Sequence, residues 1–315
     1  MLEIGYVSAP QVNLRDRVAT VYDKVGTVKN GERVSVIDRD RRFVKVRTAS
    51  GAEGWIEQRY LVNQKVFDQL QKLLGEHQDD PVQGQGITRN DTNLHVEPGR
   101  DADHLYQVAA GEKVTLLRRA TAEKPGAVVP PVRTGAKPGD KNKAEKKDAP
   151  TPVIEDWWLV RDSRGRVGWV LARLLDLDAP LEVAQYAEGQ RMVALFVLNE
   201  VRDGDKKVPQ YLTALTEPKD GMPFDFNQIR VFTWNVKRHR YETAYRERFE
   251  GVLPITVSQE NFEKEGTLPV FVVRVRDAAG NVGERKYKLN TPIVRRVLAP
   301  GEERKTAAKK PTRKP

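Results

Sequence analysis

The segment Phe43-Val-Lys-Val-Arg47, followed by Gly54-Trp55-Ile56, decides the fold of this chain because it occurs twice. The second copy reads Trp157-Trp-Leu-Val-Arg161 and then Gly168-Trp169-Val170. In each copy the tryptophan of the Gly-Trp pair lies eight residues after the arginine. Alternating apolar and polar residues are typical of half-buried strands. The repeat therefore predicts two copies of one small β unit.

The residues upstream of these strands extend the repeat. An Asn-Leu pair, Asn13-Leu14 or Asn93-Leu94, precedes a Gly-Glu-basic-Val block, Gly31-Glu-Arg-Val34 or Gly111-Glu-Lys-Val114. The leucine lies 17 residues before the glycine in both copies. Five or six short strands in about 60 residues predict a small β-barrel for each copy.

The second copy, assigned to residues 85–178, contains an insertion that the first copy, residues 1–62, lacks. The Gly-Glu block and the aromatic strand are 12 residues apart in the first copy and 46 in the second, a difference of 34 residues. The segment from about residue 122 to residue 152 is rich in Pro, Ala and Lys, a composition that predicts disorder. Because closure entropy grows slowly with loop length, we interpret this insertion as an excursion from a hairpin tip.

Both copies resemble the bacterial Src-homology-type-three (SH3b-like) domain, a small β-barrel of cell-envelope proteins. The family pattern is roughly Asn-Val-Arg, Gly-x-x-Val, Trp-x-x-Val, Gly-x-x-Gly-Trp-Val and a final aromatic-Leu. The matching residues of the first copy are Asn13-Leu-Arg15, Gly31-Glu-Arg-Val34, Phe43-Val-Lys-Val46, Gly51-Ala-Glu-Gly-Trp-Ile56 and Tyr60-Leu61. Those of the second copy are Asn93-Leu94, Gly111-Glu-Lys-Val114, Trp157-Trp-Leu-Val160, Gly165-Arg-Val-Gly-Trp-Val170 and Leu174-Leu175. His95 replaces the usual arginine and Phe43 the usual tryptophan.

This tandem resemblance implies non-catalytic modules that bind peptidoglycan or its stem peptides, or that position a neighbouring enzyme. The barrel aromatics are then the candidate ligand-binding residues, although Trp55 and Trp169 equally fit a packing role. Alternation places Trp158 on the face opposite Trp157, so we expect Trp158 to be the strongest single candidate. The candidate groove residues are Tyr22, Phe43, Trp55, Tyr106, Trp157, Trp158 and Trp169.

Residues 63–84 join the two barrels. Val66, Leu70, Leu73 and Leu74 lie at helical spacing, and Gly75 is a suitable C-terminal stop. We expect a short amphipathic helix that packs on a barrel of the same chain. A helix that binds a partner is the alternative.

Residues 184–298 show a different β pattern. Seven candidate strands lie between Met192 and Leu289, separated by turn signals such as Asp203-Gly204 and Asp220-Gly221. Seven strands in roughly 115 residues predict an antiparallel β-sandwich or barrel. The whole chain is therefore expected to be all-β, with one short connecting helix.

One stretch of this C-terminal region, residues 231–246, interleaves aromatic and basic residues. Aromatic rings next to cations bind single-stranded nucleic acids or sugar polymers. We favour the alternative of a hairpin whose aromatic residues point inward and whose basic residues lie at the turn. The residues of this secondary patch are Trp234, Lys237, Arg238, Arg240 and Tyr241.

The composition excludes several kinds of chemistry. The chain has 315 residues, no cysteine and four histidines. Disulfides, thiolate metal sites and cysteine nucleophiles are therefore excluded. The histidines show no ligand-like grouping, so we expect no metal, no cofactor and no catalytic residue. No apolar run reaches the roughly 18 residues that a transmembrane helix needs.

The net charge of +10 comes mostly from two segments of low apolar content. Residues 122–152 carry seven Lys/Arg and four Asp/Glu, and residues 299–315 carry six and two, which gives +3 and +4. We expect residues 299–315 to be a disordered basic tail that solubilises or tethers the protein. Binding to anionic polymers is the alternative.

Together these observations predict a non-catalytic binding or scaffolding protein of the bacterial cell envelope, with peptidoglycan or its stem peptides as ligand. Two alternatives are a periplasmic protein–protein scaffold and a cytoplasmic protein that binds nucleic acid through the tail and residues 231–246. A hydrolase site would require carboxylates that converge in the C-terminal domain. The start, Met1-Leu-Glu-Ile4, is not a signal peptide. We expect a missing or removed leader and a periplasmic protein or lipoprotein, although a chain without cysteine holds no lipid-anchoring site.

Overall fold

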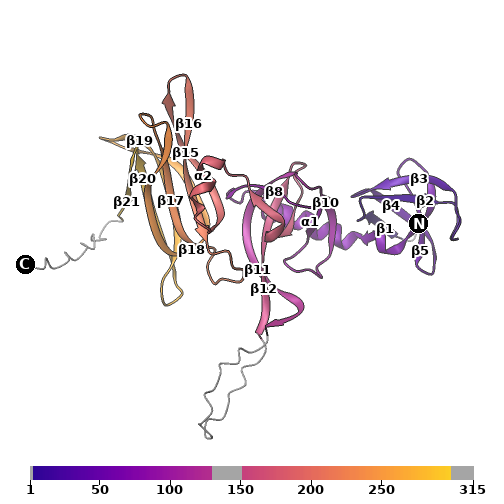
Figure 1. Cartoon of the computed structure of the whole chain (residues 1–315). Coiled ribbons are helices and arrows are strands. Elements are labelled where there is room, and N and C mark those ends of the chain that lie inside the picture. Colours follow the sequence, from indigo (N-terminus) through magenta and orange to yellow (C-terminus); the bar gives the residue numbers. More distant parts are fainter. Residues whose placement is uncertain (1–2, 130–150, 299–315) are drawn as a thin grey trace, which may run out of the picture. The chain divides into compact units, whose positions relative to one another are not determined.

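The computed structural model describes residues 3–129 and 151–298 (Figure 1). It consists of three antiparallel sheets of seven strands each, together with two short α-helices, which confirms the all-β class. The chain divides into two compact units. The first unit comprises Met1–Ala179 and Pro218–Pro223, and the second comprises Pro180–Glu217 and the chain from Phe224 onward.

The first sheet, which we call the first repeat, follows the order β3-β2-β6-β5-β4-β1-β7. All pairings between its strands are antiparallel. Its strands are β1 (Glu3–Val7), β2 (Gln11–Arg15), β3 (Lys24–Lys29), β4 (Arg33–Asp40), β5 (Phe43–Arg47), β6 (Glu53–Glu57) and β7 (Leu61–Asn63), with the 3-10 helix η1 (Gln58–Tyr60) before β7.

The second sheet, the second repeat, has the order β10-β9-β13-β12-β11-β8-β14, in which every strand is the counterpart of the one seven numbers earlier. The spacings that define the sequence repeat thus correspond to the same strand order. Its strands are β8 (Gly84–Thr88), β9 (Thr92–His95), β10 (His104–Val108), β11 (Lys113–Val129), β12 (Thr151–Asp162), β13 (Val167–Leu171) and β14 (Leu175–Leu177), with η2 (Ala172–Leu174) before β14.

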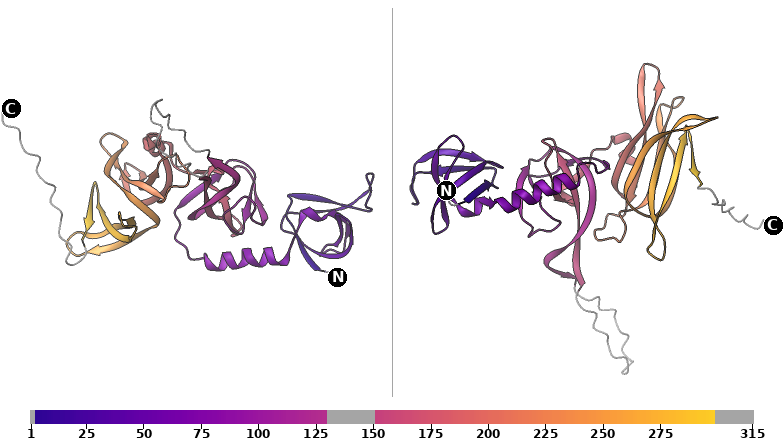
Figure 2. Two further views of the ribbon diagram at one scale, coloured as in Figure 1. Left: turned by 90° about the horizontal axis from the view of Figure 1, so that it is seen from below. Right: turned by 180° about the vertical axis from the view of Figure 1, so that it is seen from behind.

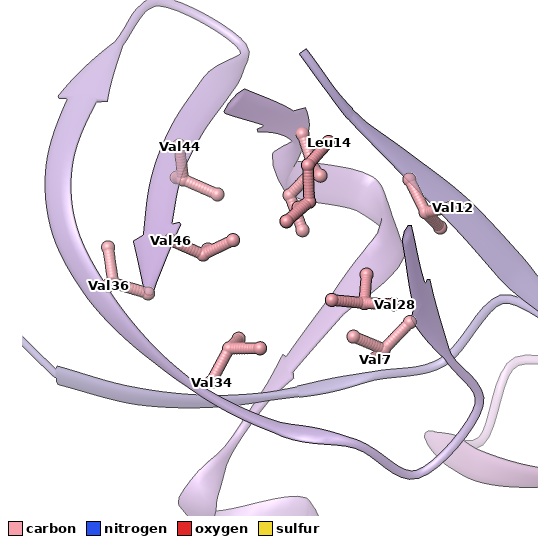
Figure 3. Packing of buried hydrophobic residues seen from close by; sticks show 9 residues of the cluster. Val7, Val12, Leu14, Val28, Val34, Val36, Val44 and Val46 are labelled. Carbon is pink, nitrogen blue, oxygen red and sulfur yellow. The ribbon is translucent and has the colours of Figure 1, made fainter. Parts of the chain in front are cut away.

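The core of the first repeat is made of small aliphatic side chains. Alternation along β2 and β5 sends Val12, Leu14, Val44 and Val46 to one face, while their neighbours point outward. Figure 3 shows the labelled valines and Leu14 meeting inside the curved sheet. The buried cluster contains Val7, Val12, Leu14, Val28, Val34, Val36, Val44, Val46 and Ile56.

The glycine before each repeated tryptophan permits a close approach of two strands. A Cβ atom at Gly54 would lie 2.6 Å from Leu14 Cβ, and one at Gly168 would lie 2.5 Å from Leu94 Cβ. No real Cβ atom tolerates such distances, so these positions require glycine. The Gly-Trp pair is thus a packing requirement of the repeated fold.

The predicted connecting helix is α1 (Gln64–Glu76), which ends one residue beyond the predicted stop at Gly75. The side chain of Asn63 accepts a hydrogen bond from the Val66 N–H and caps the N-terminus. Val66 and Leu70 are buried. The helix contacts both repeats, which agrees with packing inside the same chain (Figure 2).

A second contact ties the two repeats together. The side-chain amide of Asn30 donates to Leu105 O at 2.8 Å, and its Oδ1 accepts from the Gln107 N–H at 3.0 Å. This amide therefore satisfies the backbone on both sides of Tyr106. The Tyr6 ring stacks on Phe67 of α1 at 4.4 Å.

The structure corrects the predicted disorder of residues 122–152 at both ends. β11 continues to Val129 and β12 starts at Thr151, with Ala122 opposite Glu155 and Val128 opposite Pro152. Composition predicted disorder because the segment offers few apolar residues to bury. A two-stranded ladder needs only a partner for its backbone groups, which residues 151–155 provide. Residues 130–150 and the predicted basic tail, 299–315, lie outside the described residues.

The third sheet is a meander in sequence order, and it refines the predicted sandwich or barrel. One strand, β18, replaces two predicted strands, and β21 was not predicted. The strands are β15 (Arg191–Asp203), β16 (Lys206–Thr216), β17 (Phe226–Asn235), β18 (Arg240–Phe262), β19 (Gly266–Arg276), β20 (Val282–Asn290) and β21 (Ile293–Val297).

The long strand β18 lets this sheet fold over itself. It pairs with β17 up to Gly251 and with β19 from Gly251 onward, and its register shifts between Val252 and Thr256. Side chains of the two halves then meet, as where Tyr287 OH donates to Glu247 Oε2 at 2.8 Å. A short segment, α2 (Leu181–Ala184) with η3 (Gln185–Ala187), packs on one face of β16 and β17 through Val183 and Tyr186.

We expect Gly54→Ala and Gly168→Ala each to lower the free energy of unfolding by about 1–3 kcal/mol, because the added methyl group overlaps a core leucine. Gly283→Ala is the control, since its Cβ would meet no atom within 4 Å. Urea unfolding curves measure the difference. Equal midpoints for all three variants and the parent would contradict the packing argument.

Candidate ligand-binding face

The outer face of the first repeat gathers aromatic rings around one cation. Arg15, at the end of β2, points away from the core because Leu14 points into it. Its guanidinium carbon lies 4.2 Å from the centre of the Tyr22 ring and 5.1 Å from that of Phe43. Such distances are typical of cation–π contacts. Arg15 therefore joins two of the predicted groove aromatics that lie far apart in the sequence.

Trp55 lies in the middle of the same face. On β6 it is directly opposite Arg15 of β2 and Lys45 of β5. Side chains of opposed residues in adjacent strands share a face. A row of cation, indole and cation thus crosses three strands, and the indole is half-buried.

Two carboxylates complete this face. Glu57 lies 3.7 Å from Arg15, and Glu53 lies 3.1 Å from Lys45. Hydrogen bonds from Arg47 and then from Lys45 hold the pKa of the Glu53 carboxyl below its usual range. We call this set the outer-face cluster: Arg15, Tyr22, Phe43, Lys45, Glu53, Trp55 and Glu57.

The chemistry of the outer-face cluster suits a ligand with both flat and charged parts. Aromatic faces stack on sugar rings or apolar side chains, whereas the cations pair with carboxylates and the glutamates with amines. Arg15 is 23% exposed and Lys45 is 35% exposed, so both cations are accessible to a ligand. Its rings and charges are groups that can contact a ligand.

The same face of the second repeat is apolar. Trp169 is the counterpart of Trp55, but it lies opposite His95 and Leu159 in place of Arg15 and Lys45. Trp157, Leu159 and Trp169 belong to one buried cluster, and Leu73 and Leu74 of α1 pack against it. The helix therefore covers in the second repeat the face that carries the charged cluster in the first.

Six of the seven predicted groove aromatics consequently fall into two groups. Tyr22, Phe43 and Trp55 come together around Arg15, although Phe43 itself is only 5% exposed. Trp157, Trp158 and Trp169 are exposed by 2%, 5% and 9%. Their role in ligand binding stays a prediction, and the structure leaves them little surface for it.

Trp158 faces away from Trp157, as alternation predicts. Both faces of strand β12 are buried at this point, so neither tryptophan reaches the surface. It lies opposite Val170 in β13, the counterpart of the core residue Ile56. The strongest single candidate from the sequence therefore occupies a core position. Alternation gave the correct face but could not show that this face points inward.

Tyr106 lies at the junction of the two repeats. Its ring contacts the position of Gly31, and the Arg166 guanidinium carbon lies 4.6 Å from the ring centre. Burial raises the pKa of the Tyr106 hydroxyl. The residue is 9% exposed and takes no part in the outer-face cluster.

The secondary patch is a hairpin with its aromatic residues turned inward and its basic residues at the turn, the arrangement that we favoured from the sequence. Tyr241 is buried, Trp234 packs edge-on against it at 5.0 Å, and the indole N–H donates to Asp203 at 2.8 Å. Lys237, Arg238 and Arg240 are exposed at or beside the turn. Tyr241 thus belongs to the core and Trp234 packs half-buried against it. The role of this patch in binding stays a prediction.

The sequence analysis did not select Arg15, Lys45 or Glu57 as site residues. Each is an ordinary polar position in an alternating strand, so composition alone gave no signal. The available signal was the alternation of side chains along each strand. Lys45 shares a face with Phe43, and Glu57 shares a face with Trp55. The strand order that joins β2 to β6 is needed to add Arg15.

A pocket of about 340 Å³ lies elsewhere on the first unit. It contains none of the predicted site residues. Its polar lining comes from Glu3, Arg39, Gln58, Asn63 and Asp103.

Comparison with known proteins assigns the first repeat. Residues 10–62 match the family model of the bacterial SH3 domain, which confirms the resemblance for that copy. The second repeat shares its strand order, and its assignment to the family stays a prediction. A comparison with curated proteins gives no match.

Several solved structures show weak similarity. A NlpC/P60 family protein from Bacillus cereus is 12% identical, with a TM-score of 0.25, over 63% of this chain and 65% of that one. NlpC2 from Trichomonas vaginalis is 11% identical, with a TM-score of 0.18, over 94% and 95% of the two chains. NlpC1 from the same organism is 11% identical, with a TM-score of 0.18, over 90% and 87%. The chain spans about two thirds of the length of the Bacillus protein.

Residues 3–129 and 151–298 contain no helix long and apolar enough to cross a membrane. Within these ranges, no three His, Asp or Glu side chains are grouped as metal ligands.

We expect His95, on the face of the second repeat that α1 covers, to make the stability of the protein depend on pH. Burial, followed by the nearby His104, lowers the pKa of His95 below its usual 6.5, while its Nδ1–H donates to Ala102 O. The unfolded chain therefore takes up a proton near pH 6.5 that folded His95 takes up only at lower pH, so stability falls as the pH drops below 6.5. NMR titration of the His95 ring and urea unfolding between pH 7.5 and 5.5 measure this. A folded pKa at or above 6.5 would contradict it.

Because Trp157 and Trp158 are both buried, we expect Trp157→Ala and Trp158→Ala to destabilise the fold similarly, by about 3–5 kcal/mol each. Trp55→Ala, at a half-buried position, should cost clearly less. Thermal unfolding monitored by circular dichroism compares the three. A Trp158 variant as stable as the parent would return this residue to the list of surface candidates.

Proposed function

We propose that this protein is a non-catalytic binding protein of the bacterial cell wall, and that the outer-face cluster of its first repeat holds a peptidoglycan stem peptide. The observation that carries the proposal is the position of Arg15 over two aromatic rings, beside Trp55 and Glu57. Peptidoglycan offers sugar rings, carboxylates and amines, and the cluster has a complementary group for each. The bacterial SH3 match supports a role at the cell wall.

A binding role also agrees with the residues available for chemistry. The sequence contains no cysteine, so a cysteine peptidase mechanism has no nucleophile. We propose that the protein works outside the cytoplasm, where the wall is accessible. An envelope protein as ligand is the competing interpretation, because the same mixture of rings and charges suits a peptide segment.

The second repeat has a supporting role in this proposal. Its equivalent face is filled by α1, so it offers no matching site and holds the helix in place. The two repeats then act as one unit with a single wall-binding face.

Co-sedimentation with insoluble peptidoglycan tests the proposal. We expect the full chain to pellet at low and high salt, and Arg15→Gln and Trp55→Ala each to weaken the pelleting about tenfold, because each removes a cation or a stacking ring from one cluster. Phe262→Ala is the matched control, since Phe262 is a half-buried ring with Lys288 4.3 Å from its centre on the third sheet.

Each outcome has a defined meaning. Pelleting that is lost at high salt in every variant would assign the interaction to exposed basic residues and contradict a site built on rings. Absence of pelleting by a folded chain would also refute wall binding and direct the search to an envelope protein. Equal losses for Phe262→Ala and Trp55→Ala would exclude the outer-face cluster as the site.

A further inference from the structure

Three arginines share one face of the third sheet. Arg230 on β17 lies opposite Arg246 on β18, and Gln228 lies opposite Arg248. Opposed residues share a face, as do residues two apart in one strand. The side chains of Arg230, Arg246 and Arg248 therefore lie on one face of the sheet, which we call the arginine face.

One carboxylate of the same unit already occupies the arginine face. Glu188 Oε2 lies 2.8 Å from Arg230 Nη2 and 4.0 Å from Arg246 Nη1. Among the described residues it is the one carboxylate that pairs with these arginines, so three positive charges face one negative charge. A hydrogen bond from Arg230, with the nearby charges of Arg246 and Arg248, lowers the pKa of the Glu188 carboxyl.

Arg230 is held rigidly at the base of this face. Its side chain is 3% exposed, and its Nη1 donates to Tyr186 O at 2.5 Å. Its Nε is buried without a hydrogen-bond partner. A buried guanidinium is costly unless hydrogen bonds and a nearby anion offset its desolvation. In the free protein Glu188 supplies this anion, while the Tyr186 carbonyl holds the guanidinium independently of it.

Glu188 itself is presented on an unusual backbone. It follows η3 with a φ of 54°, in the left-handed region that few non-glycine residues adopt, and Gly189 follows with a φ of 81°. Its side chain is 60% exposed, although it is bound to a buried arginine. Because Glu188 is exposed and its backbone is strained, a carboxylate from another molecule can take its place beside the arginines.

We propose that the arginine face binds the carboxylates of an acidic peptide, and that Glu188 occupies part of this site in the free protein. The exposed Arg246 and Arg248 receive the carboxylates of the peptide, and Glu188 competes for Arg246. A carboxylate is favoured over other anions because the occupant that the fold provides is itself a carboxylate, the group that matches the planar guanidinium. This site lies in the second unit and is independent of the outer-face cluster.

The test uses a fluorescein-labelled triglutamate peptide, the full chain and fluorescence anisotropy at low ionic strength. We expect Glu188→Gln to tighten binding on the order of tenfold, because it removes the internal competitor but keeps the side-chain volume. The double variant Arg246→Gln/Arg248→Gln should lose most of the binding. Both arginines are exposed, so this variant is expected to fold, as circular dichroism will show.

The hairpin turn of the same sheet provides controls of equal charge. Glu242 is paired with the exposed Arg238 at 3.1 Å and Arg240 at 3.3 Å. Glu242→Gln and Arg238→Gln/Arg240→Gln therefore change the net charge exactly as the test variants do. We expect both controls to bind the peptide as the parent does. If controls and test variants changed binding equally, the effect would be that of net charge, and the site would be refuted.

Competition identifies the chemistry of the ligand. Unlabelled triglutamate should displace the probe, and trilysine should not. Displacement by inorganic phosphate at the same concentration as triglutamate would overturn the assignment to carboxylates. Failure of peptidoglycan pelleting would leave this site untouched, because none of its residues belongs to the first repeat.

Discussion

The contact on which the first unit depends is the packing of the α1 leucines against the second repeat. Leu73 and Leu74 pack on a cluster that contains Trp157 and Trp169, while the other end of the helix stacks Phe67 on Tyr6 of the first repeat. Val66 and Leu70 of the same helix are buried, so packing against the repeats provides the stability that a helix of 13 residues lacks in isolation. The helix is thus a structural part of both repeats.

This packing separates the roles of two nearly identical folds. In the first repeat the outer face keeps Arg15, Lys45 and Glu57 around its aromatic rings; in the second, the corresponding positions are His95, Leu159 and Leu171. A charged face can remain open to a ligand, whereas an apolar face of this size has to be covered. The difference of three side chains therefore accompanies a face that stays exposed in one repeat and a face that α1 covers in the other.

The third sheet differs from the two repeats in its strand order and in the polar groups that it buries. Its strands pair in sequence order, and β18 is long enough to belong to both halves. Buried polar groups are tied by specific partners: Arg230 by Glu188 and Tyr186, and Tyr287 by Glu247. A sheet face with a buried arginine is costly unless an anion is supplied, and Glu188, which follows η3, supplies one. The proposed acidic ligand would use the part of this face that the segment leaves exposed.

The sequence by itself determined the all-β class, the repeat, the connecting helix and the inward direction of Trp234 and Tyr241, because strand alternation and matched spacings are local properties. The extent of the strands around the insertion and the single long β18 were missed, since backbone pairing does not require apolar residues. Only the tertiary structure decided which aromatics are accessible. Trp55 and Trp169 occupy the same place in the same motif, and what distinguishes them is a helix that covers one and a strand order that brings Arg15 to the other. Such contacts join residues far apart in the chain, so no local pattern encodes them.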